Sequence, residues 1–224
     1  MTLQPHRLAV VFDLDGTLHN RQLSVEINVR EQHRRLLALH QVSEETYCRR
    51  FLELDRRGYE PKESVYRQLA EELALAIPWE DLTEDYLAEY QRFAMPMDGM
   101  RETLHALRAE GHPMALVTNG SSRMQRGKIL ALEIESSFDV VLISGEIGMK
   151  KPDPAIYRLC LDRLGSQPRN AVFVGDHPTL DVAGPQAIGM KGIWFEDMYW
   201  RECPHADASV RHLNELPSAI RALG

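Results

Sequence analysis

The chain has 224 residues, of which 44% are hydrophobic and 26% are charged, a composition typical of a globular protein with one domain and a modest insertion. Its formal net charge of −7 at pH 7 argues against general binding to nucleic acids or acidic membranes, both of which require a basic face. The three cysteines, Cys48, Cys160 and Cys203, are widely spaced and form no CxxC pair. This favours a reducing compartment over a disulfide framework.

The N-terminal segment shows no pattern typical of targeting or anchoring. Met1–Arg7 is polar, and Asp13 interrupts the apolar run that follows, so neither a signal peptide nor a membrane span is expected. The sequence therefore predicts a cytoplasmic protein with no membrane partner and no nucleic-acid partner.

Five short apolar runs, each ending at polar or glycine residues, predict buried parallel strands. They are Leu8–Leu14, Met114–Thr118, Val140–Ser144, Ala171–Gly175 and Gly192–Phe195. Helical patterns separate most of these runs. One ends at Gly111, and another opens at the N-cap pair Asp153-Pro154 and ends at Gly165. This alternation predicts an α/β domain built on a central parallel sheet.

The stretch from about Leu23 to Phe93 departs from this alternation. It contains apolar stripes at helical spacing and no convincing strand, with breaks at Ser43, at Gly58 to Pro61 and at Pro78. We interpret residues 21–95 as a bundle of about four helices, inserted into a core formed by residues 1–20 and 96–224.

Polar residues gather where the predicted strands end. The segments are Asp13-Leu14-Asp15-Gly16-Thr17, Thr118-Asn119-Gly120, Lys150-Lys151-Pro152-Asp153, and Gly175-Asp176 with Asp181 following. Parallel strands place ligand sites at their carboxyl ends, so we expect these groups to converge. Carboxylates that bind Mg²⁺, together with a lysine, a hydroxyl and backbone amides that neutralise the transferring group, are the parts that phosphoryl transfer requires.

This ordered set resembles the haloacid-dehalogenase-like (HAD) hydrolase superfamily. The segment that begins at Asp13 is similar to the first motif of that family, Thr118 to the second, Lys151 to the third, and Asp176 with Asp181 to the fourth. The resemblance spans nearly the whole chain and implies a Rossmann-like core with an inserted α-helical cap.

An aspartate at position 15 separates two branches of the family. The dehalogenases lack an aspartate at the corresponding position, whereas the phosphatases and phosphomutases have one. The resemblance therefore implies a phosphoric monoester hydrolase, similar to phosphoglycolate phosphatases and small nucleotidases. Asp13 would attack phosphorus to form an aspartyl phosphate, and Asp15 would protonate the leaving oxygen and then activate water.

The resemblance also implies the metal and phosphate ligands. Mg²⁺ would be held by the Asp13 carboxylate, the backbone carbonyl of Asp15 and Asp176, with Asp181 orienting metal-bound water. The residues expected to bind the phosphoryl oxygens are Thr118 and Lys151, helped by the backbone of Leu14 and Asn119.

Some assignments stay open in the sequence. Asp181 could cap the helix after Pro178, Lys150 could take the place of Lys151, and His177 could contact substrate or orient its loop. Within the predicted cap, Arg57 beside Gly58 could reach an anionic or ribosyl leaving group, whereas Arg56 is expected to be a solvated helix end.

The predicted substrate is a small phosphorylated metabolite, and the expected assembly is a monomer or a homodimer. Two alternatives to a phosphatase remain. One is a phosphomutase on a sugar phosphate that uses the same two aspartates. The other is a catalytically silent module with a phosphate-binding or regulatory role.

Overall fold

The computed structural model describes residues 7–37, 42–197 and 199–224. The chain separates into two compact units, one formed by the residues up to Asn20 and from Pro96 onwards, the other by Arg21–Met95. Residues 1–6, which belong to the segment where no targeting signal is expected, lie outside the described residues. None of the described helices is long and apolar enough to cross a membrane.

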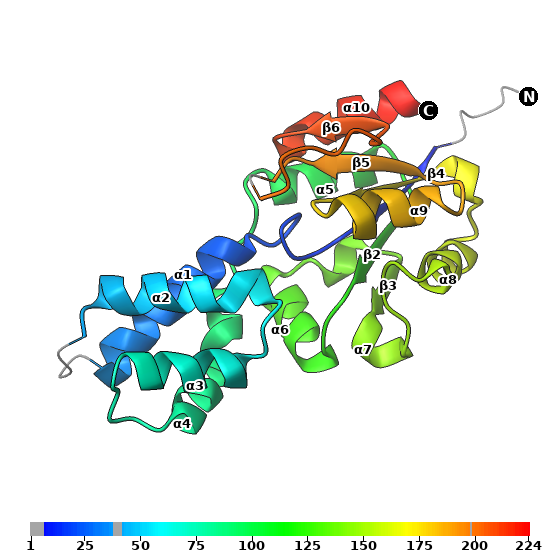
Figure 1. Ribbon diagram of the computed structural model, residues 1–224. Coiled ribbons are helices and arrows are strands. Elements are labelled where there is room, and N and C mark those ends of the chain that lie inside the picture. Colours follow the sequence, from blue (N-terminus) through cyan, green and yellow to red (C-terminus); the bar gives the residue numbers. More distant parts are fainter. Residues whose placement is uncertain (1–6, 38–41, 198) are drawn as a thin grey trace, which may run out of the picture. The chain divides into compact units, whose positions relative to one another are not determined.

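The first unit is built on a parallel sheet of six strands (Figure 1). The strands are β1 (Ala9–Phe12), β2 (Met114–Thr118), β3 (Val140–Ile143), β4 (Ala171–Gly175), β5 (Lys191–Phe195) and β6 (Ala208–Val210). Their order is β3-β2-β1-β4-β5-β6, so β1 lies inside the sheet between β2 and β4. The predicted α/β class with a central parallel sheet is confirmed. The sixth strand, β6, was missed because three residues are too few to show a periodic pattern.

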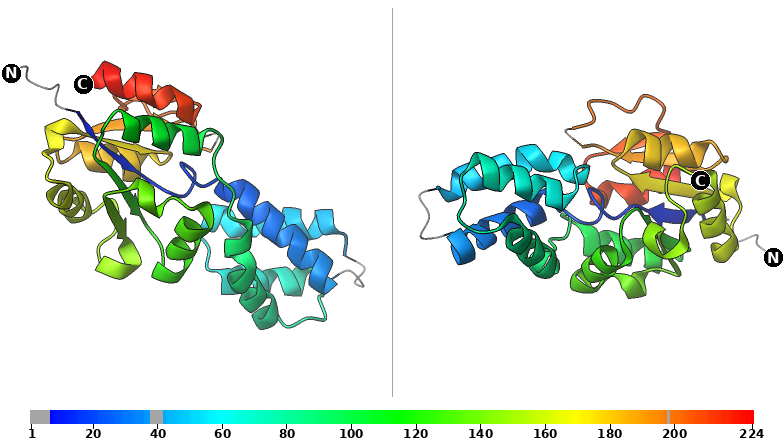
Figure 2. Two further views of the ribbon diagram at one scale, coloured as in Figure 1. Left: turned by 180° about the vertical axis from the view of Figure 1, so that it is seen from behind. Right: turned by 60° about the horizontal axis from the view of Figure 1, so that its bottom comes forward.

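Helices cover both faces of this sheet. Alternate residues of β1 to β4, such as Val11 and Phe173, pack against one side of helix α8 and form one core cluster. Helices α5 and α10 pack against each other on the opposite face (Figure 2). Burial on both faces explains why these strands are continuous apolar runs in the sequence. The α-helices of this unit are α5 (Met100–Ala109), α6 (Ser122–Leu132), α7 (Ser144–Ile147), α8 (Pro154–Leu164), α9 (Gly184–Gln186) and α10 (Leu216–Leu223).

The ends of α8 follow from local sequence. Asp153 is the N-cap and accepts a hydrogen bond from the Ala155 amide at 2.9 Å. Pro154 occupies the first helical position, where a missing N–H costs nothing. Gly165 ends the helix with φ +64°, a backbone conformation that a glycine adopts without steric penalty. Both predicted ends of this helix are confirmed.

The second unit consists of helices, and its described residues contain no strand. The α-helices are α1 (Arg21–Gln32), α2 (Glu44–Asp55), α3 (Lys62–Glu72) and α4 (Trp79–Glu89). Its core is aromatic, with the Phe51 ring 5.1 Å from Tyr66 and 5.4 Å from Tyr86. The Tyr47 and Tyr66 hydroxyls both donate to Gln32 Oε1, at 2.8 and 2.7 Å. The apolar stripes in this part of the sequence therefore form the core of the bundle, and the predicted count of about four helices is confirmed.

Short helical turns complete both units. They are His33–Leu37, Arg56–Gly58, Tyr90–Phe93, Glu135–Ser137, Pro168–Asn170, Pro178–Ala183 and Leu213–Glu215.

Candidate functional site

The sheet brings the ends of three strands to one edge. Strand β1 pairs in parallel with both β2 and β4, and the Asp13 amide donates to the Val174 carbonyl at 2.9 Å, one residue past the end of the strand. Asp13, Thr118 and Asp176 therefore stand at the carboxyl ends of adjacent strands, where parallel sheets bind ligands.

Three buried carboxylates form a cluster at this edge. One oxygen each from Asp13, Asp176 and Asp181 lies within 4.8 Å of the other two. Among the residues that the structure describes, this is the one group of three or more potential metal ligands. Gly16, with φ +92°, makes the cluster possible, since a Cβ atom there would lie 2.7 Å from Asp176 Oδ2. Three carboxylate oxygens are a donor set suited to a divalent cation such as Mg²⁺.

A buried lysine faces these carboxylates. Lys151 is 3% exposed, and its Nζ donates to Asp13 Oδ1 and to Asp181 Oδ1, each at 2.6 Å. The Asn119 side chain holds the Lys151 backbone, because its Oδ1 accepts from the Lys151 amide at 2.9 Å and its Nδ2 donates to the Lys151 carbonyl at 3.0 Å. Lys150 is exposed. Of the two adjacent lysines, the structure brings Lys151 into the cluster.

The cluster holds more negative than positive charge. Burial, opposed by Lys151 but assisted by Asp181, raises the pKa of Asp13 above its usual range. Burial alone would lower the pKa of Lys151, but the Asp13 and Asp181 carboxylates raise it, so the lysine remains charged. A bound cation would offset the excess negative charge and favour the ionised form of Asp13.

Asp15 occupies a different environment from Asp13. Its side chain is 23% exposed, and both of its oxygens have partners. The contacts of Oδ1 are His19 Nδ1 at 2.6 Å and Lys128 Nζ at 2.8 Å, and those of Oδ2 are Lys128 Nζ at 2.7 Å and Gln125 Nε2 at 3.0 Å. Burial alone would raise the pKa of Asp15, but the Lys128 ammonium and His19 outweigh it and hold the pKa well below its usual range.

Thr118 is buried beside the same network. Its Oγ1 accepts a hydrogen bond of 2.6 Å from Gln125 Nε2, and the residue is 1% exposed. Sequence reasoning missed Gln125, Lys128 and His19. Gln125 and Lys128 lie on α6, which follows Thr118 in the chain. They are three residues apart, which places them on one face of the helix. This spacing was the only signal available in the sequence, because a sequence does not show which of its lysines are buried.

Leu14 follows Asp13 in a tight turn. Its side chain is fully buried, and its carbonyl accepts from the amides of Leu18 at 3.0 Å and His19 at 2.8 Å. The turn redirects the chain directly after β1, so that the Asp15 carboxylate contacts Lys128 of α6 while its charge still helps to raise the pKa of Asp13.

His177 and Asp181 have separate structural roles. His177 Nδ1 accepts from the amides of Thr179 at 3.1 Å and Leu180 at 3.3 Å, so His177 caps the turn Pro178–Ala183. Asp181 is not the cap. Its Oδ2 accepts from the His177 amide at 3.0 Å, and its Oδ1 accepts from Lys151.

The residues singled out in the helical unit lie in one turn. Arg56 is exposed and forms an ion pair with Glu60 at 3.2 Å, in agreement with a solvated helix end. Arg57 has φ +60° and follows Arg56 at φ +44°, so two consecutive non-glycine residues adopt the left-handed conformation before Gly58. This conformation costs free energy for an L-residue.

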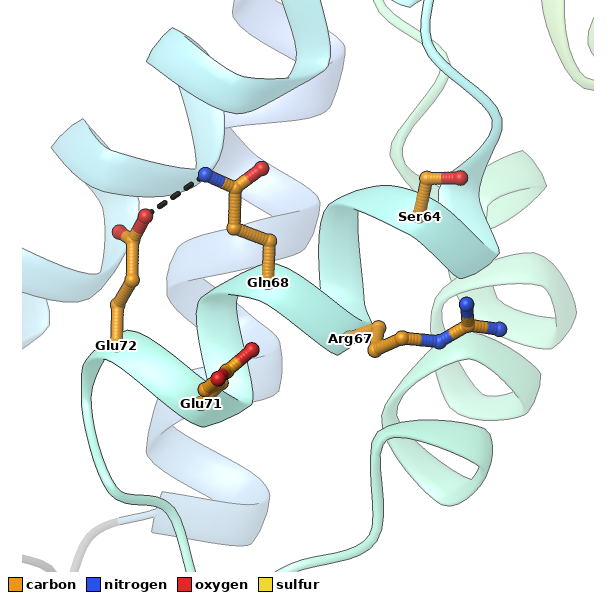
Figure 3. A pocket seen from close by; sticks show the side chains of 5 residues that line it. All are labelled: Ser64, Arg67, Gln68, Glu71 and Glu72. Carbon is orange, nitrogen blue, oxygen red and sulfur yellow. Dashed lines mark hydrogen bonds between the residues drawn. The ribbon is translucent and has the colours of Figure 1, made fainter.

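The same unit carries an open hollow on α3, of about 550 Å³, lined by Ser64, Arg67, Gln68, Glu71 and Glu72. Figure 3 shows Gln68 donating to Glu72, at 2.8 Å. None of the predicted site residues lines this hollow, and Glu72 on its rim forms an ion pair of 2.5 Å with Arg50 of α2.

Comparison with protein families identifies the class. The family of haloacid dehalogenase-like hydrolases matches residues 8–189, and the chain belongs to this family. The match includes the four segments from which the resemblance was inferred.

Two curated relatives illustrate the range of similar proteins. The chain is 34% identical over 151 residues to a phosphoserine phosphatase of Thermus thermophilus, which covers 67% of this chain and 60% of that protein. It is 35% identical over 132 residues to a glyceraldehyde 3-phosphate phosphatase of Pyrococcus furiosus, covering 56% of this chain and 53% of that protein. The matched part of the chain thus spans little more than half the length of these relatives.

Solved structures share the whole fold. A HAD phosphatase from Thermococcus onnurineus is 27% identical with a TM-score of 0.67, covering 94% of this chain and 96% of that one. The HAD-hydrolase YfnB from Bacillus subtilis, bound to magnesium, is 19% identical with a TM-score of 0.78, covering 96% and 98%. The second similarity is one of fold alone.

Proposed function

We propose that this protein is a Mg²⁺-dependent phosphatase that hydrolyses a small phosphorylated metabolite through an aspartyl phosphate on Asp13. The observation that carries the proposal is the position of Asp13, which is buried at the end of β1, 2.6 Å from Lys151 and clustered with Asp176 and Asp181. Family membership and the phosphatase names of the relatives support the same reaction.

The donor set fits a magnesium ion. Asp13 and Asp176 would supply carboxylate oxygens, together with the backbone carbonyl of Asp15. Asp181 would act through water, because Lys151 and the His177 amide already occupy its oxygens. When bound, Mg²⁺ would supply positive charge that keeps Asp13 ionised and neutralises part of the phosphoryl charge.

In the first half of the reaction, an Asp13 oxygen attacks phosphorus and the bond from phosphorus to the ester oxygen breaks. Because Asp15 is ionised in the free site, the monoanionic form of the phosphomonoester brings the proton, and Asp15 passes it to the departing alkoxide. Lys151 and Thr118 hold the phosphoryl oxygens, aided by the backbone amides of Leu14 and Asn119. Lys151 can exchange its Asp13 contact for a phosphoryl oxygen because its charge persists in the site.

In the second half, Asp15 takes a proton from water while the water oxygen attacks phosphorus. The bond between phosphorus and the Asp13 oxygen breaks, which releases inorganic phosphate and regenerates the carboxylate. One carboxyl group thus serves as acid and then as base. An aspartyl phosphate divides a very slow hydrolysis into two faster displacements.

The helical unit is proposed to act as a cap, with Arg57 contacting the leaving group. The left-handed backbone at Arg56 and Arg57 supports this, since strained backbone is often retained at functional sites. Replacing Arg57 with alanine is expected to raise KM with little effect on kcat. The protein is further proposed to be cytoplasmic and to act as a monomer or a homodimer.

Phosphate release from p-nitrophenyl phosphate, with Mg²⁺ and with EDTA, tests the proposal. Wild-type turnover should require the metal and should fall by at least about 10³-fold in Asp13→Asn. The control is Asp162→Asn, an exposed aspartate on α8 that should retain activity. Phosphoserine, glyceraldehyde 3-phosphate, phosphoglycolate and nucleoside monophosphates form the substrate panel.

The same panel separates the two alternatives. A phosphomutase would convert a sugar phosphate into its isomer with little release of inorganic phosphate. A folded wild type that binds Mg²⁺ but turns over no compound of the panel would instead indicate a phosphate-binding regulatory module.

A further inference from the structure

Lys128 is a buried lysine to which the proposed mechanism assigns no step. It lies on α6 and is 5% exposed. An ammonium group is costly to bury unless it is paired and hydrogen-bonded. Lys128 Nζ meets this requirement by contacting both Asp15 oxygens, at 2.8 and 2.7 Å, and Gln125 Oε1 at 2.7 Å.

Gln125 extends this contact to the phosphate-binding threonine. Its Nε2 lies 2.6 Å from Thr118 Oγ1 and 3.0 Å from Asp15 Oδ2, and its Oε1 accepts from Lys128. Gly120, with φ +147°, makes room for it, because a Cβ atom at this position would lie 2.9 Å from the Gln125 side chain. One face of α6 therefore connects the end of β2 to Asp15.

These contacts leave the Asp15 carboxylate little freedom to rotate. Lys128 bridges its two oxygens, His19 holds Oδ1 and Gln125 holds Oδ2. A carboxyl that must face a leaving oxygen and later a water gains from such fixed orientation, since a displacement of about 1 Å can cost about 10²-fold in rate.

We propose that Lys128, supported by Gln125, is a positioning residue that orients the Asp15 carboxyl group for proton transfer to the leaving group and from water. The inference rests on the proposed function, in which Asp15 is the proton donor and acceptor. Lys128 would not contact the reacting atoms and would act through Asp15 alone.

The test compares two aryl esters of similar shape in wild type and Lys128→Met. Phenyl phosphate needs a proton on its leaving group, because phenol has a pKa of about 10, like tyrosine. p-Nitrophenolate leaves readily without one. Lys128→Met is expected to lower kcat/KM for phenyl phosphate about 10²-fold and for p-nitrophenyl phosphate by no more than a few-fold.

A second comparison measures the effect of Lys128→Met in a protein that already carries Asp15→Asn. A residue that acts only through Asp15 should have no further effect there, so the double variant should have the kcat/KM of Asp15→Asn on both esters. Equal losses on both esters in the single variant, or an additional loss in the double variant, would overturn the inference. Arg123→Met, on the exposed side of α6, serves as the control.

A measurement without turnover keeps the two proposals distinguishable. If the wild type hydrolyses neither ester and no compound of the substrate panel, the proposed function fails, and the thermal unfolding of the single and double variants decides the positioning inference. If Lys128 acts through its contact with Asp15, Lys128→Met and Asp15→Asn together should lower Tm by clearly less than the sum of their separate effects. Additive shifts would overturn it.

Discussion

Replacing Lys151 with methionine should separate the electrostatic role of this residue from its role in catalysis. Lys151 is 3% exposed and is held by two charge-assisted hydrogen bonds of 2.6 Å, to Asp13 and Asp181. Methionine retains similar length and removes the charge. The variant therefore leaves three clustered carboxylates without this cation.

The loss of stability can be estimated from these contacts. A hydrogen bond to a charged group contributes about 1.5–3 kcal/mol, and removing one partner of a buried ion pair costs about 3–5 kcal/mol. Without divalent metal, the free energy of unfolding should thus fall by about 3–5 kcal/mol. For a chain of this size, that is a decrease in Tm of roughly 6–20 °C. The deficit should shrink in mild acid, because carboxylates that have lost Lys151 bind protons.

Lys151→Met should bind Mg²⁺ more tightly, although its free energy of unfolding falls. A lysine roughly 5 Å from a bound cation, at an effective dielectric constant of about 20, repels it by about 3 kcal/mol per unit of ion charge. Lys151→Met should therefore bind Mg²⁺ at least about 10²-fold more tightly, and Mg²⁺ should restore more of its Tm than it adds to the wild type. Phosphatase activity should nevertheless fall at least about 10²-fold, since the phosphoryl oxygens lose a cation.

Thermal unfolding in EDTA measures the loss of stability, and thermal unfolding in a Mg²⁺ titration measures how much of the Tm the metal restores. Titration calorimetry measures the affinity for Mg²⁺. Lys150→Met is the matched control, because Lys150 is adjacent and exposed and should change neither quantity. Unchanged Tm in EDTA, or weaker Mg²⁺ binding than in the wild type, would refute this account of the cluster.

Three further predictions concern other parts of the chain. Gly16→Ala should reduce activity at least about 10²-fold in the p-nitrophenyl phosphate assay, because its Cβ would lie 2.7 Å from Asp176 Oδ2. Gly148→Ala, also at positive φ but with open space around it, should cost only about 1–2 kcal/mol of stability in urea melts. Asp15 has a lowered folded-state pKa, so its contribution to stability is present above the unfolded pKa of about 3.9 and is lost as the pH falls through the folded value. The difference between wild type and Asp15→Asn in urea melts should therefore be about 2 kcal/mol at neutral pH and vanish in strong acid. Burial raises the pKa of Cys160 to about 12 and that of Cys48 to about 11, so both thiols should react with Ellman's reagent only after unfolding.

The strands that carry site residues were predictable because their physical cause is local. Buried parallel strands need apolar side chains on both faces, so β2 and β4 appear in the sequence with the bounds that the structure has. The α8 caps are equally local. Strand β6 lacked such a signal, since Ala208–Val210 is recognisable as a strand only by its pairing with β5.

The sequence by itself determined the α/β class, the helical stretch after the first strand, and the set of chemical groups at the strand ends. Each follows from periodicity or from motif order within a few residues. Only the tertiary structure decided which of these groups meet. It places Lys151 between Asp13 and Asp181, assigns the capping of Pro178–Ala183 to His177, and directs Asp15 towards Lys128, 113 residues away in the chain. Burial and pairing across such separations are properties of the packed sheet and helices, and for that reason Lys128 and a surface lysine are indistinguishable until the chain has folded.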